Sequence, residues 1–224
     1  MLPQRRNMIV FHTTKFGETS LVVHGYAEDC GRTSLLLRSG NKGNKNKRDL
    51  HPLSIISCIT SPSLKGNLDY IKEYKSEYRL DTIRTDFKKS SIAMFISELL
   101  YRNLLQSEQD ERLFNFLKEE ILLLESCSDK FANFHLRFML GYCNMLGFLP
   151  TNEFEQEFNP FSQEQQTIAR YLIDNDFENA MNYPMNRVSR VEFLKKLIQY
   201  IEFHTGMRLN LKSLSVFQEI NKTI

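Results

Sequence analysis

Eleven consecutive residues near the amino terminus, Arg38–Arg48 (RSGNKGNKNKR), contain no apolar side chain. Five of them are Lys or Arg and three are Asn. Lys and Arg neutralise backbone phosphates and release condensed counterions, and Asn donates hydrogen bonds to phosphate or sugar. Gly40 and Gly43 leave the segment flexible enough to become ordered on a ligand. This composition favours non-covalent binding of a polyanion; a solvated loop with incidental charge is the alternative.

Other cations in the first 80 residues strengthen this interpretation. A cluster of cations on one small fold would form a surface that follows phosphates. No helix for reading base edges is indicated nearby, so we expect weak sequence preference and strong salt dependence. The candidate DNA contacts are Arg5, Arg6, Lys15, Arg32, Arg38, Lys42, Lys45, Lys47, Arg48 and Lys65.

Aromatic residues in the same region could stack on bases, because every base has a π-face. Phe16 is the best candidate for an exposed ring, since it lies in a predicted turn, TKFGET, beside Lys15. Five further aromatic residues are also candidates for stacking, and packing in the core is the alternative for each. They are Phe11, Tyr26, Tyr70, Tyr74 and Tyr78.

We find no set of residues that would catalyse a covalent reaction. The histidines are scattered, and neither Gly-x-x-x-x-Gly-Lys-Ser/Thr nor Gly-x-Gly-x-x-Gly occurs. His135 lies in an apolar segment, where a core histidine is expected rather than a ligand. The cysteines at 30, 58, 127 and 143 fit no zinc spacing. We therefore expect reduced, mostly buried thiols, no metal, no cofactor and no enzymatic activity.

The elements that must position these residues begin with a β-rich block. Short runs of β-forming residues at 7–14, 19–27, 32–40, 51–60 and 68–80 alternate with turn signals. The last run could instead be helical. Five strands in about 80 residues suggest a small barrel, and in barrels of the OB type one strand face and the adjacent loops bind single-stranded nucleic acid.

From residue 88 the apolar period becomes helical. Helices are expected over 88–106, 110–126, 130–148, 162–175 and 187–206, with a short helix in the tail. The first should begin at an N-cap on Ser90 or Ser91, and the last long one should end at Gly206. The predicted fold class is α+β: a five-stranded OB-fold barrel over residues 1–80, followed by an all-α helical domain over residues 81–224.

The composition and the distribution of charge agree with a chain made of two domains. The chain has 224 residues, of which 42% are hydrophobic, enough for a substantial core. Residues 1–80 carry 13 Lys and Arg against 7 Asp and Glu, whereas residues 81–224 carry 16 against 20. No apolar run approaches the ~20 residues of a membrane span, and no secretory h-region precedes the first predicted strand. We therefore expect no membrane contact and a cytoplasmic protein.

The stretch IVFHTTKFGETSLVVHGYAEDCGRTSLLLRSG, residues 9–40, resembles the opening of the bacterial RecO family of DNA repair and recombination mediators. Apolar strands in that family alternate with short turns, a basic stretch and a Pro-containing motif. The matching elements here are Phe16-Gly17-Glu18-Thr19, Gly31-Arg32, Gly40–Arg48 and His51-Pro52-Leu53-Ser54. Helical segments at 93–104, 111–117, 131–148 and 209–220 are also similar to that family.

The resemblance implies an amino-terminal OB fold and a carboxy-terminal helical domain. It implies binding of single- and double-stranded DNA, annealing of complementary strands and association with the nucleoid. It also implies partnership with RecR and contact with the carboxy-terminal tail of single-stranded-DNA-binding protein, which together help RecA to load. Many members carry a four-cysteine zinc module after the LGF-P segment, whereas residues 151–166 here contain no cysteine. We therefore expect no zinc module.

The helical region offers a second candidate site. A groove lined by Leu and Phe with Arg at its rim could take an acidic peptide that ends in an apolar residue. Arg102 and Arg137 are the candidates for this site; a solvated helix face is the alternative. Three other functions remain open: an OB-fold RNA-binding protein, an adaptor whose basic loop meets an acidic protein without annealing DNA, and an unrecognised hydrolase.

Overall fold

The computed structural model describes residues 3–38, 50–63, 68–105, 108–148 and 160–220. The chain divides into two compact units, Met1–Glu125 and Ser126–Ile224. The first unit holds all the described strands and the helices that directly follow them; the second unit is helical.

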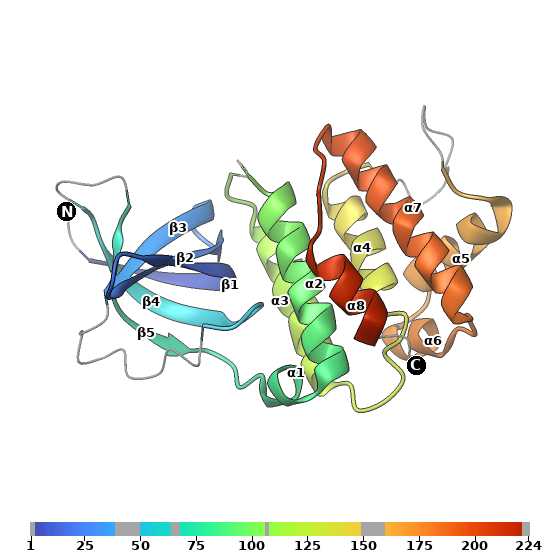
Figure 1. Cartoon of the computed structure of the whole chain (residues 1–224), viewed down its shortest axis with the longest axis horizontal. Helices are drawn as coiled ribbons and strands as arrows, with labels where there is room; N and C mark the ends of the chain where they lie inside the picture. Colours follow the sequence, from blue (N-terminus) through green and yellow to red (C-terminus); the bar gives the residue numbers. More distant parts are fainter. Residues whose placement is uncertain (1–2, 39–49, 64–67, 106–107, 149–159, 221–224) are drawn as a thin grey trace. The chain divides into compact units, whose positions relative to one another are not determined.

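Five strands form a closed barrel in the order β1-β2-β3-β5-β4 (Figure 1). Neighbouring strands are antiparallel except β3 and β5, which are parallel. This Greek-key arrangement is the OB fold, so the predicted barrel is confirmed. The bounds are β1 Gln4–Phe16, β2 Ser20–Ala27, β3 Gly31–Arg38, β4 Ile55–Ser61 and β5 Tyr70–Ser76.

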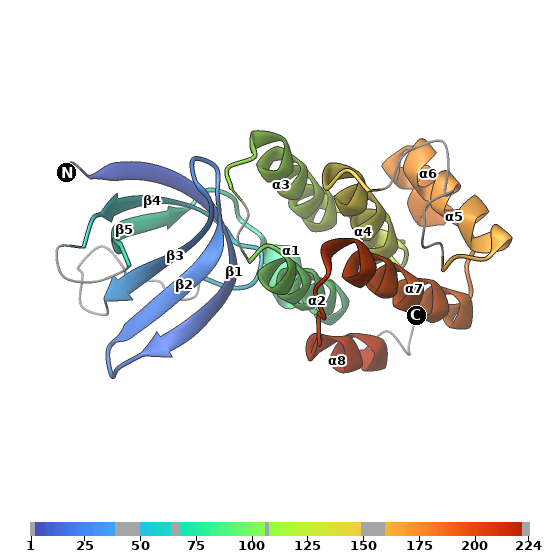
Figure 2. The same cartoon turned by 90° about the horizontal axis from the view of Figure 1, so that it is seen from above.

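The first strand is longer than the sequence pattern predicts because it serves two neighbours. Gln4–Ile9 pairs with β4, and Met8–Phe16 pairs with β2. The register shifts between Val10 and His12, where a bulge or irregularity interrupts the pairing. Figure 2 shows β1 curving across the barrel beside β2. The polar start of β1 therefore belongs to the sheet although it lacks an apolar face.

Alternation along the strands directs the apolar side chains to the barrel interior. Burial of these side chains is the main contribution to barrel stability. The central members of this core are Met8, Val10, Val23, Ala27, Leu35, Leu37, Ile56, Cys58 and Ile71.

Three helices complete the first unit: α1 Asp81–Thr85, α2 Phe87–Asn103 and α3 Glu111–Ser126. The predicted apolar face of α2 is buried. The N-cap is Asp86, whose side chain accepts hydrogen bonds from the amides of Lys88 and Lys89, so the prediction of Ser90 or Ser91 was wrong. The carboxylate reaches two free amides at once, which stabilises the first turn at that position.

Hydrogen bonds attach the barrel to these helices. The Ser97 hydroxyl of α2 donates to the carbonyl oxygen of Phe11 in β1. The Tyr26 hydroxyl of β2 donates to the carbonyl of Glu108 and accepts from the amide of Asp110, at 2.9 and 3.0 Å. Both side chains bond to main-chain groups of the other element. These bonds hold α2 and the chain leading to α3 against the barrel.

The second unit contains α4 Phe134–Met145, α5 Gln163–Asp174, α6 Phe177–Asn182, α7 Arg187–Thr205 and α8 Ser213–Ile220. As predicted, α7 ends at Gly206, which adopts the left-handed conformation with φ of 67°. The short helices α1 and α6 were not predicted. The division at residues 80 and 81 into a DNA-binding and a partner-binding domain stays a prediction.

Candidate nucleic-acid interface

One row of side chains crosses the outer face of β1, β2 and β3. Phe16 pairs with Ser20, and Ser20 pairs with Arg38. Leu37 belongs to the core, so alternation turns its neighbour Arg38 outward. Phe16 is 58% exposed, and Arg38 is exposed. The prediction that Phe16 is accessible is confirmed, and the register brings it onto the same row as a cation.

Arg38 lies over an aromatic ring of the neighbouring strand. Its guanidinium carbon is 4.5 Å from the ring centroid of Tyr70 in β5, and its Nη2 donates to the Tyr70 hydroxyl at 3.1 Å. A guanidinium placed over a ring still has N–H groups available for a ligand. Together, Phe16 and the Arg38–Tyr70 pair offer surfaces for base stacking and phosphate contact. We call Phe16, Arg38 and Tyr70 the stacking row.

The loops that would extend this row contain most of the predicted cations. Lys15 is exposed next to Phe16. The segment that begins at residue 39, directly after Arg38, carries Lys42, Lys45, Lys47 and Arg48. These four residues, which we call the loop cations, and Lys65 between β4 and β5 lie outside the described residues. OB folds bind oligonucleotides on the strand 2–3 face and with the loops after strands 1 and 4.

Arg5 lies at the other end of β1. Its Nε donates to the Ser57 hydroxyl of β4 at 3.0 Å, beside a depression of about 360 Å³ between β1, β4 and β5. Glu73 lies in the same depression, and Lys75 is 3.8 Å from Glu77. The charges there nearly cancel, so this depression is less suited to a polyanion than the stacking row is.

Arg6 and Arg32 are engaged within the first unit. Arg6 pairs with Asp29 at 3.0 Å, and its side chain is 10% exposed. Arg32 donates to the carbonyl oxygens of Gly25 and Thr33, both at 3.3 Å, and burial lowers its pKa. Their predicted role in contacting DNA stays a prediction, although Lys15 and Arg38 are more accessible.

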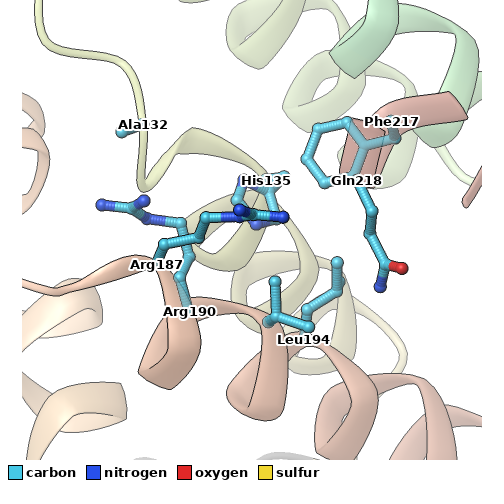
Figure 3. A pocket seen from close by; sticks show the side chains of 8 residues that line it. Ala132, His135, Arg187, Arg190, Leu194, Phe217 and Gln218 are labelled. Atoms are coloured by element: carbon cyan, nitrogen blue, oxygen red, sulfur yellow. The ribbon is translucent and has the colours of Figure 1, made fainter. Parts of the chain in front are cut away.

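A cavity in the second unit is bordered by α4, α7 and α8. Figure 3 shows side chains from these helices around one space, with two guanidinium groups near His135. Sequence reasoning missed this site, although the Arg-x-x-Arg spacing at the start of α7 places both cations on one helix face. The lining residues are Ala132, His135, Arg187, Arg190, Val191, Leu194, Phe217 and Gln218.

The wall of this cavity is rigid and mostly apolar. The Arg190 Nε donates to the Asn133 side-chain oxygen at 3.1 Å, and its Nη2 donates to the Met185 carbonyl at 2.8 Å. The His135 ring meets the Phe217 ring edge-on, with 4.8 Å between centroids. Only 3% of His135 is exposed, so it is a core histidine, as predicted. The cavity combines one cation held by hydrogen bonds, Arg190, and the exposed Arg187 with apolar side chains.

His135 makes the stability of the second unit depend on pH. Burial, with a smaller contribution from the charge of Arg190, lowers its pKa from 6.5 to about 3. The unfolded chain takes up this proton near pH 6.5, so the contribution to stability is full above that pH and is lost as pH falls towards 3. We expect His135→Phe to reduce the pH slope of the unfolding free energy by up to about one proton, or ~1.4 kcal/mol per pH unit.

Urea unfolding measured at several pH values between the two pKa values tests this expectation. The stability of the variant above pH 7 serves as the control, because it reports the change in packing without protonation of histidine. An unchanged pH slope in His135→Phe would show that His135 is not the titrating group.

The two predicted peptide-binding arginines belong to different compact units. Arg102 of α2 pairs with Glu98 at 2.9 Å. Arg137 of α4 lies with its guanidinium carbon 5.6 Å from the Phe177 ring centroid. Arg137 thus lies beside an aromatic side chain, as a peptide-binding rim would require, and the role of both arginines stays a prediction.

Neither a metal-binding cluster nor a membrane-spanning helix is found among the described residues. Among them, no group of three or more His, Cys, Asp or Glu side chains could hold a metal ion. Residues 149–159, where family members carry the zinc module, lie outside the description, so the expected lack of zinc stays a prediction. All four cysteines are free thiols. No helix in the described ranges is long and apolar enough to span a membrane.

The fold and the candidate site define an OB-fold protein with a cationic and aromatic outer strand face and a helical region after the barrel. Residues 1–78 match the family model for the Recombination protein O N terminal, and residues 84–155 match the model for the Recombination protein O C terminal. The chain belongs to the RecO family of DNA repair and recombination proteins.

Curated relatives agree with this assignment. The DNA repair protein RecO of Phocaeicola vulgatus is 32% identical, over 95% of this chain and 96% of the relative. The corresponding proteins of Flavobacterium psychrophilum and Christiangramia forsetii are 31% and 30% identical over the same shares. The resemblance noted in the sequence is therefore confirmed.

Proposed function

We propose that this protein is a mediator of DNA repair and homologous recombination that binds single- and double-stranded DNA and anneals complementary strands. One observation carries the proposal: Phe16 and Arg38, which lies over the partly buried ring of Tyr70, are exposed on the outer strand face, directly before the segment that holds the loop cations. This is the face on which OB folds bind oligonucleotides.

Annealing requires no covalent chemistry, which fits a chain without a recognisable catalytic set. Two strands repel one another through their phosphates, and a cationic surface screens that repulsion. Stacking on Phe16 would support individual bases while their pairing edges stay accessible. The side chains that carry the process are then Lys15, Phe16, Arg38 and the loop cations.

The family assignment extends the proposal to partners. We infer that the protein acts in the cytoplasm at the nucleoid, together with RecR, and helps RecA to load on single strands coated with single-stranded-DNA-binding protein. The acidic carboxy-terminal tail of that coating protein would bind the helical region. Arginines at the rim of apolar surfaces match an acidic peptide that ends in an apolar residue.

Charge reversal at the predicted rim tests the peptide contact. We expect Arg102→Glu with Arg137→Glu to weaken binding of an acidic tail peptide about 10-fold, because each lost cation removes a charge-assisted contact. Binding of naked DNA should fall much less than binding of the peptide, since neither arginine belongs to the stacking row. Fluorescence anisotropy with labelled peptide and labelled oligonucleotide measures both affinities.

A matched variant locates the peptide more closely. Arg187→Glu removes an exposed cation beside the cavity of Figure 3. Loss of peptide binding in this variant alone would move the peptide site to that cavity. An equal loss of peptide and DNA affinity in the double variant would contradict a separate peptide site.

A quench assay tests the proposed activity itself. Two complementary oligonucleotides, one with a fluorophore and one with a quencher, should pair faster in the presence of the protein. Single-stranded RNA and an acidic protein, added as competitors, should displace DNA less effectively than DNA itself. Binding without acceleration, or a clear preference for either competitor, would support an RNA-binding protein or an adaptor instead.

A further inference from the structure

Three aromatic side chains form a cluster where the barrel meets α2. His12 of β1 lies directly opposite His24 of β2, and their rings are nearly parallel, with centroids 6.2 Å apart. Tyr101 of α2 meets both histidine rings edge-on, with centroids 5.4 Å away in each case. His12 is exposed, whereas His24 and Tyr101 are partly buried. An accessible ring is therefore backed by two rings that the fold holds in place.

The supporting rings have little freedom to move. His24 shares hydrogen bonds with the Thr14 hydroxyl at 3.1 Å and with the Ser34 hydroxyl at 2.8 Å. The guanidinium carbon of Arg32 lies 4.7 Å from the Tyr101 ring centroid and fixes that ring from another side. Burial also lowers the pKa of His24 to about 4, so its ring is neutral at neutral pH. The ring of His12 is therefore supported by the neutral ring of His24 and by the ring of Tyr101.

This cluster continues the stacking row along β1. Side chains at 12, 14 and 16 point to the same side of the strand, because alternation in β-strands has a period of two. Four residues along a strand span about 13 Å. The pairing of Thr14 with Val22 and of His12 with His24 shows that the register is unbroken over this stretch. A strand laid on Phe16 and directed along β1 would meet the exposed face of His12.

The charges around the cluster are compatible with a polyanion. Arg32 supplies a positive charge behind Tyr101. On α2, the carboxylate of Glu98 is paired with Arg102 at 2.9 Å, which offsets its negative charge. The site therefore combines an accessible ring with a net positive charge around it, which suits single-stranded nucleic acid.

We propose that His12, supported by His24 and Tyr101, is a second base-stacking position, so that a single strand runs from Phe16 along β1 to α2. This inference rests on the proposed function, because it assumes that the outer strand face binds DNA. It adds a defined path for the strand and assigns α2 to the binding surface.

The chain contains no tryptophan, which permits a direct test. His12→Trp and Phe16→Trp each introduce a single indole, and Phe203→Trp introduces one at an exposed position of α7 as the matched control. With an oligothymidylate of about 12 nucleotides, within the range of OB-fold site sizes, we expect quenching of the first two indoles and none of the third.

The pattern of quenching separates the two claims. Quenching of Phe16→Trp without quenching of His12→Trp overturns the second stacking position and leaves the proposed function intact. Absence of quenching in both variants contradicts DNA binding on this face and therefore both claims. Quenching of all three would show that the signal does not report local stacking, and crosslinking then decides the question.

Affinity and crosslinking provide measurements that do not depend on an introduced indole. His12→Ala should weaken binding about 5-fold or more, and His12→Phe should restore it, because stacking needs a ring and not a charge. Failure of His12→Phe to restore affinity would contradict stacking. In the wild-type protein, an iodouracil-substituted oligonucleotide should crosslink to His12 or Tyr101, and crosslinks confined to other strands would overturn the inference.

Discussion

Replacing Lys42, Lys45, Lys47 and Arg48 by glutamine is expected to lower the affinity for single-stranded DNA on the order of 100-fold at moderate salt. Each of these cations can neutralise one phosphate, and the counterions released make the largest non-specific contribution to binding. The slope of log affinity against log salt should become shallower by about 3, because single strands contribute roughly 0.7 for each phosphate contact. Acceleration of annealing should be lost in parallel.

A control variant carries the same change in net charge in a different part of the chain. Glutamine at Lys195, Lys196, Arg208 and Lys212 removes four positive charges from the second unit. Fluorescence anisotropy across a salt series should show wild-type affinity and slope for this control. Equal losses in both variants would mean that net charge, rather than the loop cations, controls binding.

Gly25→Ala is expected to destabilise the barrel by at least about 2 kcal/mol. A Cβ atom at this position would lie 2.1 Å from the carbonyl oxygen of Ile9 and 2.6 Å from the Cε atom of Met8. The first of these neighbours is backbone, so β1 itself would have to shift. Because β1 pairs with both β2 and β4, the displacement would disturb both sides of the barrel.

Urea and thermal unfolding of the variant measure this effect, and Gly17→Ala is the matched control. Nothing lies within 4 Å of a Cβ at Gly17, although its φ of 63° makes alanine strained there. The control should therefore lose only about 1 kcal/mol. If Gly25→Ala cost no more than Gly17→Ala, the close approach of β1 and β2 would be contradicted.

The barrel could be predicted from sequence because its strands are separated by strong local signals. Turns containing Gly17 and Gly31 divide apolar runs whose lengths suit strands. The polar start of β1, Gln4–Arg6, was missed because it is held by pairing with β4 rather than by apolar alternation. The N-cap at Asp86 was missed because two serines nearby gave an equally plausible local signal.

The candidate site could be predicted only in part. The basic segment and Phe16 are visible as a local composition and a turn, whereas the partner of Arg38 depends on the parallel pairing of β3 with β5. The engagement of Arg6 by Asp29 and of Arg32 by Tyr101 joins residues far apart in the chain. These long-range contacts determine which cations are accessible. The spacing of residues along the sequence does not reveal them.

Alternating apolar residues close a barrel, and its register places Phe16 and Arg38 in one exposed row. The segment of loop cations follows that row directly in the chain. Helix α2 then fixes Tyr101 against the same face, which would extend the surface available to a strand. Electrostatic attraction and stacking are the two interactions through which this surface would bind single strands.

The most direct test of this account is the affinity of the wild-type protein for a single-stranded oligonucleotide, measured by anisotropy between about 50 and 200 mM salt. Several phosphate contacts on the barrel predict a linear fall of log affinity with log salt and a slope steeper than about −2. An affinity that stays flat over this range, or no detectable binding at the lowest salt, would contradict it.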